Sequence, residues 1–187
     1  QIKTSDEFLM SVNAWRKGGA PSGTAAMMVP VNTKVTLDEL IKGIAIQSGN
    51  DACIAVAEGM SGSEANFAKA MTEEARRIGL TKSSFANSTG LQDENHLMTA
   101  REIALLAQYI IKEYPDYYQV FSQKEYQYKK HKFYNRNPLL FLGIVFGYWG
   151  FGPLVFYLLT LQFNASMMEQ TLAAVPLFIF MGVMMEQ

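Results

Sequence analysis

The sequence predicts a helix-rich unit with a few strands in residues 1–140, followed by a hydrophobic, membrane-type segment in residues 141–187. Three observations support this division. All 16 Lys and Arg residues lie between Lys3 and Arg136, whereas only two charged residues follow position 140. Before that position, apolar residues recur at the spacing of amphipathic helices. After it, long uncharged stretches are typical of membrane proteins.

Two consecutive helices are predicted in the middle of the first part. Apolar residues recur at helical spacing over residues 37–47, and acidic residues in the first turn favour the helix dipole. A second helix over residues 51–59 consists of small apolar residues, which indicates burial on most sides. Ser48-Gly49-Asn50 separates the two helices. Cys53 has apolar neighbours and is predicted to be a small buried hydrophobe, not a nucleophile.

Capping patterns mark the starts of two further helices. The Ser-x-x-Glu pattern at residues 61–64 predicts a helix over residues 63–78, for which Gly79 is a suitable C-terminal residue. The Thr-x-x-Glu pattern at residues 99–102 predicts a helix that stops before Pro115.

The remaining segments of the first part are predicted to be loops and strands. Residues 16–23 form a loop by composition, because they are rich in Gly, Pro and Ser. The apolar run at residues 27–31 predicts a strand, and residues 34–36 a second extended piece. Aromatic residues alternate loosely with polar ones over residues 117–134, which favours a strand pair.

The charge pattern argues against a nucleic-acid partner. Basic and acidic residues are interspersed over residues 1–140, whereas a nucleic-acid interface needs a one-sided basic patch. Lys129, Lys130 and Lys132 form a basic run, which we interpret as a solvated turn or strand edge. The two histidines, His96 and His131, lack ligand-spaced partners, so the sequence predicts no metal site. No cofactor is indicated.

The second part has the composition of one or two membrane helices. Residues 141–163 are 23 consecutive residues without a charge. At about 1.5 Å per residue they suffice to cross a hydrocarbon core of about 30 Å. A second apolar run, residues 172–185, is shorter and contains Pro176. The sequence therefore predicts a hydrophobic transmembrane segment in residues 141–187.

Ser48-Gly49-Asn50 is the stretch with the most chemical content, and its residue types allow two interpretations. Ser, Asn and Asp before an apolar helix are good N-caps, so helix capping explains them without any function. Alternatively, the element presents a hydroxyl and a carboxamide on one exposed turn, two residues apart. In an acyl-transfer site, Ser48 can then relay a proton and Asn50 can hold a substrate amide.

Residues 42–58 resemble, nearly residue for residue, the Ser-x-Asn region of bacterial D-alanyl-D-alanine carboxypeptidases. These enzymes are low-molecular-weight penicillin-binding proteins, serine peptidases of family S11. The likeness covers residues 1–140 and includes further family landmarks at residues 13–19, 85–91, 98–102 and 135–140. The resemblance implies an α+β fold, the helix-rich part of the β-lactamase and penicillin-binding-protein transpeptidase-like fold. Residues 1–140 would be a partial carboxypeptidase domain.

The resemblance also implies an activity, which is serine-type removal of the terminal D-Ala from peptidoglycan stem peptides. Ser48 and Asn50 match the family's catalytic Ser-x-Asn element. The partners implied are pentapeptide stems and β-lactams, and the implied location is the bacterial cell envelope, on the periplasmic side of the inner membrane. The other two family motifs, Ser-x-x-Lys and Lys-Thr-Gly, do not occur in this sequence. We therefore expect a truncated fragment without carboxypeptidase turnover.

The tail carries a resemblance of its own. Residues 172–186 are similar to the large membrane subunit of tripartite ATP-independent periplasmic (TRAP) transporters, and residues 141–147 fit the preceding helix of that subunit. Three alternatives to a carboxypeptidase fragment follow: a membrane-tethered, non-catalytic module, a piece of such an organic-acid permease, or an artificial junction between Leu140 and Phe141. Resequencing across that junction tests the last of them.

Overall fold

The computed structural model describes residues 2–137 and residue 140. Its elements in chain order are β1 (Glu7–Leu9), α1 (Val12–Gly18), η1 (Ala20–Ser22), β2 (Lys34–Thr36), α2 (Leu37–Gln47), α3 (Asn50–Ser61), α4 (Glu64–Arg77), α5 (Ala100–Glu113), α6 (Pro115–Tyr118), η2 (Gln119–Ser122), β3 (Glu125–Tyr128) and β4 (His131–Tyr134). The η elements are 3₁₀ helices. The predicted helices over residues 37–47, 51–59 and 63–78 are confirmed, with ends shifted by one or two residues.

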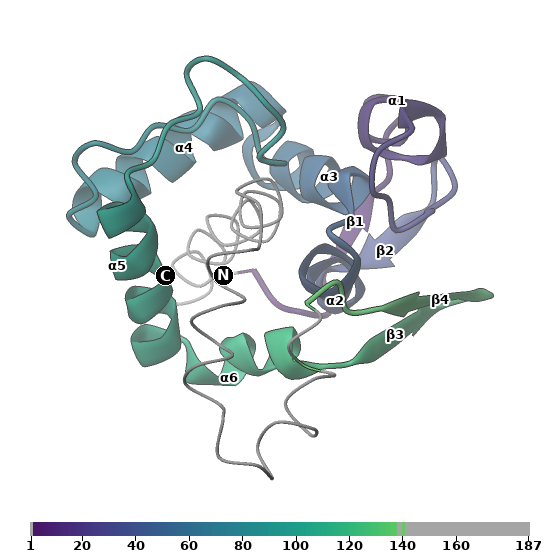
Figure 1. Cartoon of the computed structure of the whole chain (residues 1–187). Helices are drawn as coiled ribbons and strands as arrows, with labels where there is room; N and C mark the ends of the chain where they lie inside the picture. The colour runs from purple at the N-terminus through teal and green to yellow at the C-terminus, as the bar shows by residue number, and fades with distance from the viewer. Residues whose placement is uncertain (1, 138–139, 141–187) are drawn as a thin grey trace, which may run out of the picture.

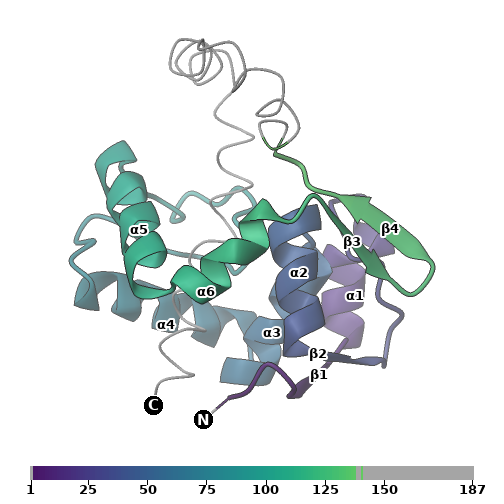
Figure 2. The same cartoon turned by 90° about the horizontal axis from the view of Figure 1, so that it is seen from below.

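The helices from α3 to α6 follow an arc that starts at α2 and returns to it (Figure 1). α3 packs against α1, α2 and α4, while α5 and α6 lead through η2 back to α2. Two small antiparallel sheets complete the described part (Figure 2). β1 pairs with β2, placing Phe8 opposite Val35, and β3 pairs with β4, placing Tyr126 opposite Phe133.

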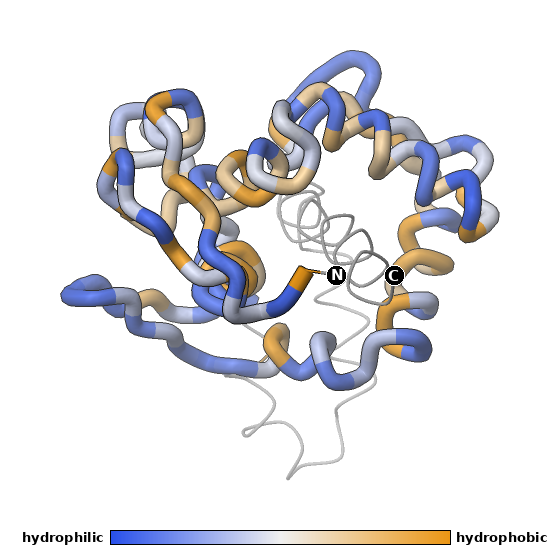
Figure 3. The backbone as a smooth tube through the Cα atoms, turned by 180° about the vertical axis from the view of Figure 1, so that it is seen from behind, coloured by the Kyte–Doolittle hydropathy of each residue, from blue (hydrophilic) through white to orange (hydrophobic). Residues whose placement is uncertain are grey.

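The hydrophobic core surrounds α3, as its small apolar side chains predicted. Residues 51–57 are all buried, and Phe67 of α4 is the largest side chain that is fully buried among the described residues. Cys53 is buried among them, and burial raises the pKa of its thiol far above the ordinary range, so its prediction as an inert hydrophobe is confirmed. α4 and α5 alternate between hydrophilic and hydrophobic positions along their length (Figure 3).

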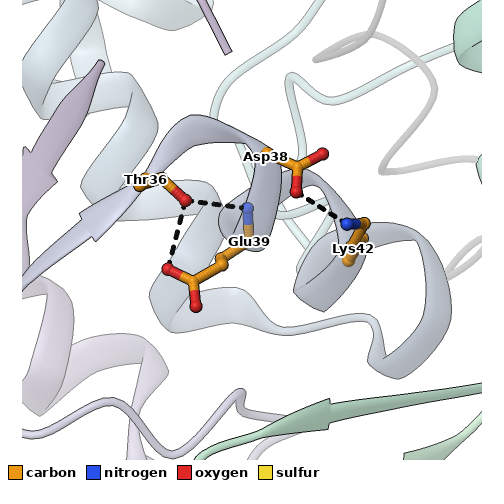
Figure 4. Close-up of polar contacts among 4 residues, drawn as sticks. All are labelled: Thr36, Asp38, Glu39 and Lys42. Carbon is orange, nitrogen blue, oxygen red and sulfur yellow. Dashed lines mark hydrogen bonds and ion pairs between the residues drawn. The ribbon is translucent and has the colours of Figure 1, made fainter. Parts of the chain in front are cut away.

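α2 begins where the sequence predicts, and its first turn is held by side chains (Figure 4). The Thr36 hydroxyl accepts a hydrogen bond from the Glu39 N–H at 3.3 Å and donates one to the Glu39 carboxylate at 3.1 Å. One turn along the helix, the Lys42 ammonium lies 2.6 Å from the Asp38 carboxylate. These contacts fix the start of the helix whose other end carries Ser48.

The strand predicted over residues 27–31 is wrong. The N–H groups of Met27 and Val29 donate to the carboxylate of Asp51, which lies more than twenty positions further along the chain. Met28 between them has a positive φ of 62°, which no strand residue adopts. A buried side chain therefore replaces the neighbouring strand as hydrogen-bond partner. The loop predicted over residues 16–23 is also wrong in part, because it holds the end of α1 and all of η1.

The capping box predicted at residues 61–64 is wrong, and the one predicted at residues 99–102 is only half formed. α4 is capped by Ser63, whose hydroxyl accepts from the Asn66 N–H, and not by Ser61. α5 is capped by Thr99 as predicted, at 3.2 Å from the Glu102 N–H. The carboxylates that should close the boxes are bound elsewhere. Glu64 accepts from Ser88, and Glu102 accepts from Ser83 and the N–H of Lys82.

The strand pair predicted over residues 117–134 is confirmed only in its second half, as β3 and β4. Residues 115–122 are instead helical, in α6 and η2, because Pro115 starts a new helix at its first position. Lys129 and Lys130 form the turn of the hairpin, and Lys132 is exposed on β4, so the interpretation of this run as a turn and strand edge is confirmed.

No helix within residues 2–137 is long and apolar enough to cross a bilayer. The predicted membrane helices, in residues 141–163 and 172–185, lie outside the described residues, as does the segment that resembles the TRAP permease.

His96 provides a test of pH dependence. Burial lowers its pKa from 6.5 despite the attraction of Asp93, and its Nδ1 accepts the Ala86 N–H at 3.4 Å. The unfolded chain therefore binds a proton before the folded one does as the pH falls. We expect the free energy of unfolding of the full chain to fall as the pH drops below 6.5 and through the folded pKa of His96. Urea titrations between neutral and mildly acidic pH measure this, and a His96→Asn variant with the same slope as the parent would contradict it.

Candidate active site

The Ser-x-Asn element forms the sharp turn between α2 and α3. Ser48 ends α2 in the left-handed conformation, with φ 61° and ψ 41°. Its N–H donates to Ile44 at 3.0 Å, and the Gly49 N–H donates to Gly43 at 3.1 Å, so the last carbonyls of the helix are satisfied. A serine in this conformation costs about 1 kcal/mol or more, and such strained residues cluster at functional sites.

Side-chain capping of the start of α3 does not explain this element. Gly49 is the N-cap residue of α3 and has no side chain with which to cap it. Asn50 and Asp51 already lie in the first turn of the helix. The interpretation of Ser48-Gly49-Asn50 as an N-cap of α3 is therefore wrong. Ser48 is instead the C-cap residue of α2 through its backbone N–H, a role that does not require a serine side chain.

The turn is more packed than the exposed turn that the sequence predicts. Gly49 is buried and the Asn50 side chain is only 7% exposed, whereas Ser48 is half-buried. Within residues 2–137, the Asn50 carboxamide makes no hydrogen bond, so its donor and acceptor groups are not used up by the described part of the fold. The structure brings Ser48 and Asn50 together on one turn, as predicted.

Asp51 fixes this turn, and sequence reasoning missed it. Its carboxylate is fully buried and accepts hydrogen bonds from the N–H of Met27 at 2.7 Å, Ala52 at 3.0 Å and Val29 at 3.3 Å. Burial raises the pKa of this carboxyl group, and the three N–H donors oppose that rise. A signal existed, because an Asp followed by the apolar run of residues 52–57 must find buried donors.

The backbone on both sides of the turn is clamped. The Asn50 N–H donates to Ala25 at 2.9 Å, beside the bonds from Asp51 to the same segment. From the other side, Gly18 at the end of α1 packs on the peptide between Asn50 and Asp51. A Cβ at Gly18 would lie only 2.5 Å from the Asn50 carbonyl carbon and from the Asp51 nitrogen. Gly18 is thus a second residue that positions the site and that sequence reasoning missed.

Two of the four further landmark segments meet this turn. Residues 13–19 include Gly18, and the Arg136 N–H of residues 135–140 donates to Ile46 at 3.3 Å, in the last turn of α2. The other two landmarks have structural contacts with α4 and α5. Asn87 closes its own loop by accepting the N–H of Gly90 at 2.7 Å, and residues 98–102 start α5.

Comparison with known proteins decides the family. The family model described as D-alanyl-D-alanine carboxypeptidase, peptidase S11, matches residues 1–145. The chain belongs to this family. DacC of Escherichia coli K12, a D-alanyl-D-alanine carboxypeptidase, is 37% identical over 141 residues, which are 75% of this chain and 35% of DacC. DacF of Bacillus subtilis is 40% identical over 112 residues, which are 60% of this chain and 28% of DacF.

Solved structures of the family have the same fold. Penicillin binding protein 5 of Haemophilus influenzae superposes with a TM-score of 0.70 at 33% identity, over 75% of this chain and 40% of that one. Penicillin binding protein 6B of Escherichia coli gives 0.69 at 29% identity, over 74% and 44%. The predicted helix-rich part of the transpeptidase-like fold is confirmed. The chain spans about a third of the length of the curated relatives it matches.

Proposed function

We propose that residues 1–140 are a partial carboxypeptidase domain and supply the Ser-x-Asn wall of a serine-type D-Ala-D-Ala carboxypeptidase site. The substrate class is the peptidoglycan stem peptide, and β-lactams bind the same pocket. The observation that carries this proposal is the conformation of the turn. Ser48 is held left-handed as the C-cap residue of α2, and the side chains of Ser48 and Asn50 do not cap the start of α3. Family membership supports the assignment of this turn to acyl transfer.

Each side chain of the turn has a role suited to its chemistry. A hydroxyl such as that of Ser48 can both donate and accept a hydrogen bond, so it can relay the proton of an attacking nucleophile. The Asn50 carboxamide has two donors and an acceptor, which can hold the amide of a stem peptide while its terminal D-Ala leaves. Asp51 and Gly18 act through the backbone of the turn and are positioning residues.

The remaining chemical groups of the reaction are not in this sequence. None of Ser5, Ser11, Ser22 and Ser48 is followed by Lys at the third position, and Lys-Thr-Gly does not occur. The nucleophile, its proton acceptor and the carboxylate anchor must therefore be provided by other residues. Those residues would act in the bacterial envelope, where the substrate lies. The full chain by itself should not be acylated by fluorescent penicillin.

A hybrid enzyme tests the proposal. Residues 2–137 replace the matching segment of DacC, which provides its own upstream and downstream parts. We expect release of D-Ala from a peptide ending in D-Ala-D-Ala. Changing Ser48→Ala or Asn50→Ala should lower kcat/KM by about 100-fold, because each removes a group that acts on the reacting atoms.

The matched controls are Ser5→Ala and Asn95→Ala, which change exposed residues that lie outside α2, α3 and the turn between them. Both hybrids should retain the parent rate. A parent hybrid that is folded and active, but equally active after both changes at the turn, would refute the role proposed for Ser48 and Asn50.

We propose that residues 141–187 are a separate, membrane-attached segment. The uncharged run at residues 141–163 supports this assignment. The likeness of residues 172–186 to a TRAP permease stays a prediction. Binding of the full chain to vesicles of neutral lipid tests the attachment, and it does not depend on the chemistry proposed for Ser48 and Asn50.

A further inference from the structure

The β3–β4 hairpin concentrates positive charge that the rest of the described chain lacks. Residues 124–136, here called the basic hairpin, carry five basic side chains and one acidic one. Residues 2–123 carry eleven basic and fourteen acidic side chains, so their net charge has the opposite sign. The basic residues of the hairpin are Lys124, Lys129, Lys130, Lys132 and Arg136.

The far end of the basic hairpin projects beyond α2 (Figure 1), whereas its strands pack against α2. Its inner side is anchored by Tyr128 and Phe133, which are both buried. Lys129 and Lys130 are exposed at its turn, and within residues 2–137 neither has an acidic partner. Lys132 pairs with Glu125 at 2.8 Å, the single acidic side chain on this hairpin. The charge at the tip is therefore available to a partner.

An exposed aromatic side chain accompanies this charge. Tyr134 is 58% exposed, and the Lys132 ammonium lies 5.4 Å from the centre of its ring. Tyrosine has an apolar ring and a polar hydroxyl, which suit the boundary between lipid and water. A lysine beside an exposed tyrosine therefore favours binding to anionic lipid headgroups over binding to a polyanion that is dissolved in water.

The length of the chain also favours a lipid partner. Arg136 and Phe141 are five residues apart, so their Cα atoms lie within roughly 18 Å of one another. If the uncharged run that starts at Phe141 enters a bilayer, the hairpin lies within reach of the headgroup layer. Surface charge acts over about 8–10 Å at physiological salt, which is enough to attract lysines at that distance.

We propose that the basic hairpin docks on anionic phospholipid headgroups, beside the point at which residues 141–163 enter the membrane. The proposal rests on that insertion and goes beyond the acyl-transfer role of the turn. Because the Arg136 N–H is bonded to Ile46 at the end of α2, docking of the hairpin also sets the orientation of the Ser48 turn relative to the membrane.

Vesicle co-sedimentation of the full chain tests this docking. Binding to phosphatidylcholine vesicles is compared with binding to vesicles of phosphatidylcholine and phosphatidylglycerol in equal parts. We expect tighter binding to the anionic vesicles. The double change Lys129→Gln/Lys130→Gln should reduce that preference by roughly tenfold, because each lysine near the surface strengthens binding about fivefold before screening.

The matched control is Lys69→Gln/Lys112→Gln, which removes the same charge from exposed positions on α4 and α5, on the opposite side of Figure 1. It should leave the preference unchanged. Equal binding of the parent to both vesicles, or equal loss in both double variants, would overturn the proposal. So would tighter binding to soluble polyphosphate than to anionic vesicles at equal phosphate concentration and ionic strength, which would assign the hairpin to a phosphate polymer.

The vesicle experiment distinguishes a failure of membrane insertion by residues 141–163 from a failure of docking by the hairpin. Binding to anionic vesicles alone would support contact of the hairpin with anionic lipid, but it would refute insertion of residues 141–163 and so overturn docking beside an insertion point. Equal binding to both kinds of vesicle would support insertion and refute docking. Neither result depends on carboxypeptidase activity.

Discussion

Replacing Asp51 by alanine should lower the free energy of unfolding of the full chain by about 4 kcal/mol. The change leaves the N–H groups of Met27, Val29 and Ala52 buried without their acceptor. Each unsatisfied buried group costs about 1–3 kcal/mol, and part of that total is returned because the buried carboxylate itself was costly. Urea denaturation monitored by circular dichroism measures the difference.

Two further variants separate the carboxylate's role from a general loss of charge. Asp38→Ala removes a half-exposed carboxylate whose partner is Lys42, and it should cost only about 0.5 kcal/mol. Asp51→Asn keeps the shape but presents an amide N–H₂ to an N–H donor, so we expect an intermediate loss of about 2 kcal/mol. An Asp51→Ala variant as stable as Asp38→Ala would show that these hydrogen bonds do not hold the turn.

Replacing Gly18 by alanine should destabilise the chain by about 3 kcal/mol, at the upper end for overpacked positions. The added methyl group would lie 2.5 Å from backbone atoms of Asn50 and Asp51, which cannot move without displacing the turn. In the hybrid enzyme, the same change should lower kcat/KM, because the Asn50 carboxamide shifts relative to the substrate. Thermal unfolding and D-Ala release measure the two effects.

Gly43→Ala is the matched comparison. A Cβ at Gly43 would also lie 2.5 Å from a neighbour, but that neighbour is the Met27 sulfur, at the flexible end of a side chain. Methionine adapts its conformation easily, and alanine is the better helix former, so a loss of about 1 kcal/mol or less is expected. Equal losses at Gly18 and Gly43 would mean that contact with the backbone of the turn is not the cause.

Local patterns were sufficient for α2, α3, α4 and α5 and for the position of the Ser-x-Asn turn. The spacing of apolar residues over residues 37–47 is confined to a few helical turns. The same holds for the small residues of 51–59. Thr99 likewise caps its helix as predicted, through a bond to a residue three positions away. Such features depend on neighbours in the chain, so a single sequence contains them.

The failures at residues 27–31, Glu64 and Glu102 share one cause, which is competition from distant partners. Residues 27–31 have the composition of a strand, but Asp51 takes their N–H groups. Glu64 and Glu102 have the spacing of capping-box residues, but Ser88 and Ser83 bind them instead. No local sequence pattern indicates whether the local contact or the distant one has the lower free energy.

The sequence by itself determined the family likeness, the helical order and the pairing of a hydroxyl with a carboxamide around Gly49. Only the tertiary structure decided that Gly49, and no side chain of this element, begins α3, and that Asp51 and Gly18 hold the turn from two sides. The physical reason is that periodicity and capping act within a few residues. Burial of a carboxylate and close backbone contact depend instead on segments that meet only when the chain is folded.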